Sequence, residues 1–187
     1  MDDGGSVTTL TQGLTRRQAI AGAAGAFAGL VLRSTSASAE AEDGISHTAA
    51  AIHQEPVFAA SPQRVYEALT DAGEFTRVIR LSGALQAMRL PDKPAEISRE
   101  AGGAFALFGG YITGRQIELV PNVRIVQAWR PGDWAPGIYS IAKFELVQQG
   151  SGSKIVFDHT GFPTHEAQSL AFGWTTHYWE PLAKVLA

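Results

Sequence analysis

The sequence predicts an α+β domain in which an antiparallel sheet packs on one long C-terminal helix. A helix-start signal, Ser61-Pro62, follows a first apolar segment. Between residues 95 and 160, short apolar runs alternate with turn residues, which is typical of an antiparallel meander. From Thr164 to Leu186, apolar residues recur at three- and four-residue spacing, which is typical of one amphipathic helix.

The first part of this domain is expected to be one strand followed by two short helices. The strand is placed at residues 47–58. Ser61 is the predicted N-cap, and Pro62 occupies the first helical position, where an N–H would have no partner. We expect a break near Gly73, after which the helix resumes over residues 75–79.

The meander is expected to contain six strands. Its hairpin turns are predicted at Gly109-Gly110, Pro121-Asn122 and Gly150–Ser153, because Gly frees and Pro fixes the backbone angle φ. The strands are placed at residues 95–100, 104–108, 111–120, 123–129, 139–148 and 154–160.

The last helix, predicted from Thr164 to Leu186, has an apolar stripe broad enough to cover a wide surface. Gly173 inside it either permits the close approach of another backbone or leaves open volume. Pro181 removes one internal hydrogen bond, so we expect a bend near His177. The stripe consists of Ala167, Leu170, Ala171, Trp174, Tyr178, Leu182 and Val185.

Residues 1–39 have the three parts of an export signal in order. A polar stretch leads to Arg16-Arg17, and an uncharged run of Ala and Gly follows, which is too short for a permanent membrane anchor. Residues 15–20 resemble the twin-arginine (Tat) consensus, with Ala19 in place of its usual Phe. The small residues at 37–39 predict cleavage by signal peptidase after Ala39. The alternatives are a mitochondrial presequence, which Asp2 and Asp3 disfavour, and a disordered tail.

The chain that remains after cleavage is one domain, with a flexible lead-in at residues 40–46 and the domain proper at 47–187. It carries 12 basic and 16 acidic side chains without a basic stripe, so neither nucleic acid nor a membrane surface is expected as a partner. The absence of cysteine excludes disulfides and thiolate chemistry. No cofactor is expected, and no metal site, because the histidines are not spaced to converge.

Five segments carry a family resemblance: Gly109–Arg115, Val120-Pro121, Ile125–Arg130, Phe157–Pro163 and Trp174–Leu182. Together they resemble the START-like (SRPBCC) superfamily, and within it the branch named for activators of heat-shock protein 90 ATPase. The resemblance covers about residues 50–187 and implies the helix-grip fold, a curved sheet of six or seven strands wrapped around the last helix. It also implies an apolar cavity between sheet and helix. Because the superfamily includes lipid carriers, receptors and cyclases, the fold does not fix the function.

Side-chain alternation along the strands predicts the lining of that cavity. Lys143, Glu145 and Lys154 should face water, and Glu118 facing water should turn Ile117 inward. The predicted lining residues are Tyr111, Ile117, Trp129, Trp134, Phe144, Phe157, His159, Trp174 and His177.

His159 is the candidate catalytic residue, because an inward imidazole can exchange a proton near neutral pH. A hydrogen-bonded core histidine is the more frequent role for such a residue. Convergence of His159 with His177 and with Tyr111 or Tyr139 would favour acid–base or ligand-orienting chemistry. No nucleophile elbow, phosphate loop or zinc-protease motif is present in the sequence.

The loop at residues 130–137 places Trp134 between rigid Pro and Gly residues. Trp134 either closes the cavity mouth or packs on the surface beside a local pair of Arg130 and Asp133.

Three functions follow from these observations. The first is an exported domain, periplasmic or secreted, that binds a small apolar molecule. The second is a cyclase, hydrolase or isomerase that uses His159 with a tyrosine. The third, implied by the resemblance, is interaction with a chaperone ATPase, which export from the ATP-containing compartment disfavours.

Overall fold

The computed structural model describes residues 51–187 of the chain. The predicted signal, its cleavage site, the lead-in at residues 40–46 and the first residues of the predicted strand 47–58 lie outside the described part. Among the described residues, no helix is long and apolar enough to cross a membrane.

Two capped helices follow the first strands, as predicted, but they divide at a different residue. α1 (Pro62–Thr70) begins at Ser61, whose hydroxyl accepts from the Arg64 N–H. α2 (Ala72–Leu81) begins at Asp71, whose carboxylate accepts from the Glu74 N–H at 2.9 Å. The predicted break near Gly73 was therefore two residues late, because the side-chain cap at Asp71 starts the second helix. A short helix that was not predicted, α3 (Ala84–Ala87), follows.

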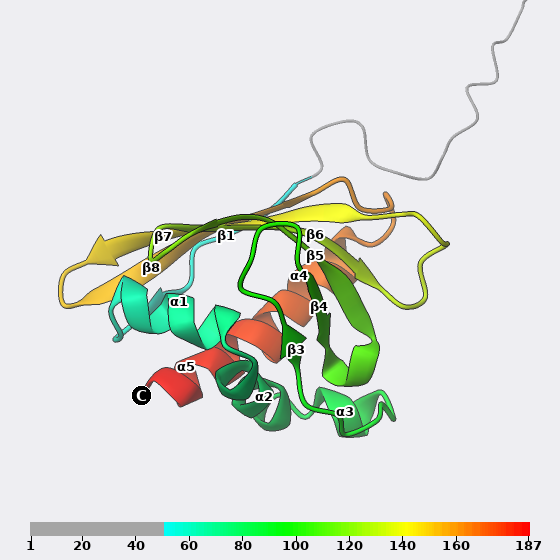
Figure 1. Ribbon diagram of the computed structural model, residues 1–187, viewed down its shortest axis with the longest axis horizontal. Helices are drawn as coiled ribbons and strands as arrows, with labels where there is room; N and C mark the ends of the chain where they lie inside the picture. The colour runs from blue at the N-terminus through cyan, green and yellow to red at the C-terminus, as the bar shows by residue number, and fades with distance from the viewer. Residues whose placement is uncertain (1–50) are drawn as a thin grey trace, which may run out of the picture. The chain divides into compact units, whose positions relative to one another are not determined.

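The strands form one antiparallel sheet in the order β1-β8-β7-β6-β5-β4-β3, with β2 also paired to β8. The sheet curves over the helices, which all lie on one side of it in Figure 1. The strands are β1 (Ile52–Gln54), β2 (Val57–Phe58), β3 (Glu96–Ile97), β4 (Ala104–Leu107), β5 (Ile112–Val120), β6 (Arg124–Pro131), β7 (Ser140–Gln149) and β8 (Gly152–Thr160). The predicted α+β class and all six meander strands are confirmed.

Two connections differ from the predictions. The predicted first strand is divided into β1 and β2 at Glu55-Pro56, where proline has no N–H to give to the sheet. At Gly109-Gly110 the chain forms a 3₁₀ turn, η1 (Phe108–Gly110), in place of a simple hairpin turn. Phe108 and both glycines have positive φ angles there.

A bulge in β5 makes the predicted orientation of Ile117 wrong. Gln116 pairs with Gln127 of β6, but Glu118 pairs with Val126, so Ile117 is an extra residue on its strand. Ile117 is 49% exposed, whereas Gln116 is fully buried. Simple alternation from Glu118 pointed Ile117 inward, and the inserted residue reverses that phase.

The C-terminal helix is one continuous element with a widened middle. α4 (Ala167–Gly173) leads into a π-helical segment, η2 (Trp174–Trp179), and then into α5 (Glu180–Leu186). The bend expected near His177 corresponds in position to this π segment. Pro181 lies just after it and cannot donate a backbone hydrogen bond to the preceding turn.

An aromatic cluster joins this helix to the concave face of the sheet. Phe157 of β8 lies between Phe144 of β7 and Trp174, with ring centroids 5.0 and 4.4 Å away respectively. Trp174 and Trp179 stack at 5.6 Å on the helix itself. Sheet and helix therefore share one core.

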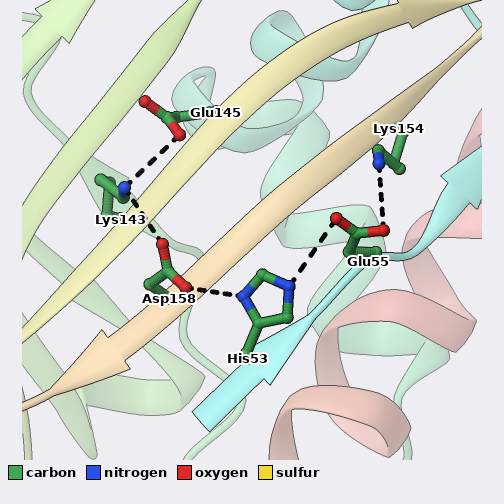
Figure 2. A network of polar contacts seen from close by, with 6 residues as sticks. All are labelled: His53, Glu55, Lys143, Glu145, Lys154 and Asp158. Carbon is green, nitrogen blue, oxygen red and sulfur yellow. Dashed lines mark hydrogen bonds and ion pairs between the residues drawn. The ribbon is translucent and has the colours of Figure 1, made fainter. Parts of the chain in front are cut away.

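The opposite face of β1, β7 and β8 carries an alternating charge network, shown in Figure 2. Lys143 lies between Asp158 at 3.0 Å and Glu145 at 3.4 Å. His53 contacts Asp158 at 2.7 Å, and Lys154 lies 3.0 Å from Glu55. These side chains are all partly exposed, so the predicted outward orientation of Lys143, Glu145 and Lys154 is confirmed.

Candidate functional site

A cavity of about 230 Å³ lies beside the first half of the C-terminal helix. Its walls come from α4 and η2, from the turn η1, from α3 and from the loop that follows β6. This volume exceeds the roughly 150 Å³ cavity that holds benzene in a well-studied engineered case, and it is below the usual range of drug-sized sites. The residues that line it are Ala84, Met88, Phe108, Tyr111, Ile112, Trp129, Pro131, Asp133, Trp134, Glu166, Ser169, Leu170, Phe172, Gly173, Trp174, His177 and Tyr178.

Aromatic rings from three parts of the chain form the inner wall. Trp129 of β6 lies edge-on to Trp134 at 5.9 Å and contacts Trp174 at 5.4 Å. Tyr178 packs on Trp174 at 4.1 Å, and its hydroxyl accepts from the Trp129 indole N–H at 3.4 Å. Contact among these rings fixes their positions, so the wall exists before any ligand enters.

Gly173 keeps this space open from the helix side. Its backbone is helical, with φ of −59° and ψ of −41°, so no turn requires glycine there. A Cβ atom added at Gly173 would meet no atom within 4 Å. The predicted alternative of open volume at Gly173 is therefore the one that the structure has.

Polar side chains in the lining, among them Tyr111, Asp133, Glu166 and His177, give the cavity its polarity. The Nδ1 atom of His177 is buried and has no hydrogen-bond partner among the described residues. Burial, together with the negative charges of Asp133 and Glu166, raises the pKa of Tyr111 to about 12. Tyr111 therefore stays protonated at neutral pH, and it shares the cavity lining with both carboxylates.

His159 lies in the core behind the cavity wall, where it forms a closed chain of hydrogen bonds. The Trp174 indole N–H donates to its Nδ1 at 2.9 Å. This contact places the ring proton on Nε2, which donates to the Ser140 hydroxyl at 2.6 Å. Ser140 in turn donates to the Trp129 carbonyl oxygen at 3.0 Å. Both ring nitrogens of His159 are thus used within the protein.

Burial lowers the pKa of His159 to about 3, so the ring is neutral across the physiological range. His159 does not line the cavity, and its hydrogen bonds go to Ser140 and Trp174. His177 and Tyr111 line the cavity instead, and Tyr139 is exposed with the Arg130 guanidinium 5.7 Å from its ring. The arrangement that would have favoured acid–base chemistry by His159 is not formed.

Five of the predicted lining residues meet at the cavity, and four do not. Tyr111, Trp129, Trp134, Trp174 and His177 line it. Phe144, Phe157 and His159 point inward as predicted but are packed in the core away from it, and Ile117 faces outward. Trp134 is buried in the cavity wall, while Arg130 donates to the Trp134 carbonyl oxygen and does not pair with Asp133.

Sequence reasoning missed several helix and loop residues of the lining, among them Met88, Phe108, Asp133 and Glu166. Phe172 lies there with 67% of its surface exposed. The available sequence signal for an opening was Phe172 next to Gly173 within the predicted helix. Among residues 51–187, no three histidine or carboxylate side chains gather closely enough to hold a metal ion.

The family is decided by a match over residues 59–187 to the model described as Activator of Hsp90 ATPase homolog 1-like protein. The chain belongs to this family. Among curated relatives in the Activator of Hsp90 ATPase family, the human activator of 90 kDa heat shock protein ATPase homolog 1 is 27% identical over 112 residues, which are 60% of this chain and 32% of that protein. The mouse homolog 2 is 29% identical over 93 residues, or 50% of this chain and 28% of that protein. The matched region thus spans about a third or less of these relatives.

Solved structures of other proteins have a similar fold. A crystal structure of an HSP90 activator from Plasmodium falciparum has a TM-score of 0.64 and 24% identity, covering 73% of this chain and 95% of that one. A protein from Micromonospora echinospora has a TM-score of 0.59 and 18% identity, covering 77% and 83%. The helix-grip fold that the resemblance implied is therefore confirmed.

Proposed function

We propose that this domain binds one small, mostly apolar molecule in the cavity beside the C-terminal helix. The observation that carries the proposal is an aromatic wall beside a helical glycine, Gly173, with open space where a side chain would fit. The cavity volume of about 230 Å³ suits a molecule of one or two rings.

The cost of Gly173 supports this function. Glycine inside a helix is about 1 kcal/mol less favourable than alanine. The backbone angles do not require glycine, and nothing occupies the position of its missing Cβ. Keeping the cavity open is the role that remains for a glycine at this position.

The polar atoms of the cavity support the same function. A buried nitrogen such as Nδ1 of His177 normally has a partner. A bound molecule with one polar group would supply that partner, while its apolar part would lie against Trp129, Trp134 and Trp174. His159, on which a catalytic role would have rested, is neutral and already bonded on both ring nitrogens. We therefore propose binding in preference to turnover.

The test is ligand binding by a variant that fills the cavity. Gly173→Leu places a side chain in the open space, whereas Ala183→Leu adds the same side chain at an exposed position of α5. Native mass spectrometry should find small molecules co-purified with the wild type and with Ala183→Leu but not with Gly173→Leu. Thermal stabilisation by naphthalene-sized compounds should show the same pattern. Equal binding by all three proteins would contradict the proposal.

A second candidate function is interaction with a heat-shock protein 90 ATPase, which the family match favours. Capture of that ATPase by the purified chain, with a change in its ATP turnover, would support this candidate. Failure of both at micromolar concentrations would count against it.

We further propose that residues 1–39 direct Tat export and that signal peptidase cleaves after Ala39. Protein isolated from the periplasm or the medium should then begin at Glu40. Lysine substitution of Arg16 and Arg17 should retain the chain in the cytoplasm. An intact Met1 in the exported protein would contradict the cleavage site.

A further inference from the structure

We propose that the ligand of this cavity is a hydrophobic organic cation, an amine whose apolar body lies among the tryptophans and whose ammonium group lies near Asp133 and Glu166. The inference rests on the proposed binding function and specifies the class of molecule bound.

The charge of the lining carries the argument. Asp133 and Glu166 are its charged residues, and neither lysine nor arginine contributes to it. The two carboxylates come from different elements, the loop after β6 and the residue that precedes α4. Both line the same cavity as Tyr111, whose pKa their negative charges help to raise.

Among residues 51–187, neither carboxylate is paired with an arginine or a lysine. Within residues 51–187, Asp133 forms no ion pair, and Glu166 accepts a hydrogen bond from the Ser169 hydroxyl at 2.9 Å and lies 3.5 Å from the His165 ring, which is 80% exposed. Arg130, the nearest arginine in the sequence, is engaged elsewhere: it donates to the Trp134 carbonyl oxygen and lies over the Tyr139 ring. A cation entering from solvent would therefore meet two negative charges that no arginine or lysine neutralises.

The aromatic wall favours the same sign of charge. The face of an indole or phenol ring attracts cations and repels anions. An ammonium group near Trp134 and Tyr111 gains from both the rings and the carboxylates, while a carboxylate on the ligand would be repelled by both. The order of affinity expected for one apolar body is therefore amine, then alcohol, then acid.

Three probes of similar size test this order: 2-(1-naphthyl)ethylamine, 2-(1-naphthyl)ethanol and 1-naphthylacetate. Calorimetric titration of the full chain at pH 7 should give the amine about tenfold higher affinity than the alcohol, as expected for two partly exposed ion pairs. The preference should shrink as salt is raised from about 0.05 to 0.5 M.

Neutral, nearly isosteric variants identify the groups responsible. Asp133→Asn and Glu166→Gln should each reduce the amine preference to about threefold and, combined, should reduce it to the small remainder that the rings supply, without changing affinity for the alcohol. Glu180→Gln, at an exposed position of the same C-terminal helix outside the cavity, is the matched control and should bind like the wild type.

The outcomes separate this inference from the proposed function. If the alcohol or the acid binds as tightly as the amine, the ligand class is wrong while the binding function stands. The same holds if the variants keep the full amine preference. If none of the probes binds and Gly173→Leu changes nothing, the binding function itself is overturned.

Discussion

His159 shows at the scale of one residue how burial and hydrogen bonding set the role of a titratable group. Trp174 fixes its tautomer by donating to Nδ1, and the Ser140 hydroxyl oxygen accepts a hydrogen bond from Nε2–H. The ring therefore connects the C-terminal helix to β6 and β7 through β8. Its position in the core makes it a structural residue of the aromatic cluster.

Replacing Ser140 by alanine should destabilise the fold by about 1–3 kcal/mol. The change leaves both the His159 Nε2–H and one lone pair of the Trp129 carbonyl oxygen without their side-chain partner in a buried site. Urea unfolding measures the loss. Ser169→Ala, at an exposed position of α4, is the control and should stay within about 0.5 kcal/mol of the wild type. A loss below that value for Ser140→Ala would contradict the hydrogen-bond chain.

Stability should fall as the pH falls below about 6.5, the pKa of an unperturbed histidine. His159 takes up a proton in the unfolded chain at that pH but not in the folded one, where burial lowers its pKa to about 3. The expected slope is up to about 1.4 kcal/mol per pH unit between pH 6 and 4.5. This pH window lies above the acid range in which Asp158 and Glu74 lose their contributions to stability. The pKa values of these two carboxyls are lowered first of all by hydrogen bonds to His53 and Arg64, respectively.

The contribution of His53 to stability depends on pH in the opposite direction. Its hydrogen bond with Asp158 raises its pKa, so its contribution is present below pH 6.5 and is lost as the pH rises through its folded pKa. NMR titration distinguishes the two histidines: the ring signals of His53 should shift as the pH passes through its raised pKa, and those of His159 should stay constant down to about pH 4.5. A His159 ring that titrates near pH 6 would contradict its assignment as a buried neutral group.

At the scale of the element, the C-terminal helix combines two tasks in one segment. Its second half packs against α1 and α2, and its first half forms a wall of the cavity. The π segment between them brings Trp174, Tyr178 and Trp179 onto the core side together. Such widened turns occur often at functional sites.

Gly173→Ala should raise the stability of the domain by about 1 kcal/mol, because alanine is the better helix former and its Cβ meets no atom within 4 Å. Gly114→Ala is the contrasting substitution. A Cβ at Gly114 would clash with the Ala128 carbonyl oxygen and the Phe105 ring, so a loss of more than 1 kcal/mol is expected. Thermal unfolding compares both with the wild type. A destabilised Gly173→Ala protein would show that the space is needed for the fold.

At the scale of the whole molecule, the aromatic cluster makes the sheet and the C-terminal helix one cooperative unit. All four tryptophans of the chain are buried in it. Neither layer can separate from the other without exposing these rings to water.

Denaturant unfolding followed by tryptophan fluorescence and by far-ultraviolet circular dichroism should therefore give one coincident transition. The folded protein should emit at a shorter wavelength than the unfolded chain, since every indole leaves a buried position on unfolding. A fluorescence change that precedes the loss of secondary structure would indicate that the helix leaves the sheet first.

The sequence by itself determined the class of fold, the order of the elements and most inward-facing residues, because alternation in strands and spacing in helices are local properties of the backbone. It placed Phe144, Phe157 and His159 inside correctly. Tertiary structure decided which inward residues line a cavity and which are packed. That outcome depends on whether side chains from distant elements fill the shared volume.

The same reason accounts for the remaining differences between the expectations from sequence and the structure. The bulge at Ile117 depends on the register between two strands, and the π segment depends on packing along the whole helix. The two carboxylates of the cavity lining, Asp133 and Glu166, are 33 positions apart in the sequence, and neither has a local signal that relates it to the other. Local geometry specified the elements of this protein, whereas the location and the charge of its cavity arise only where those elements meet.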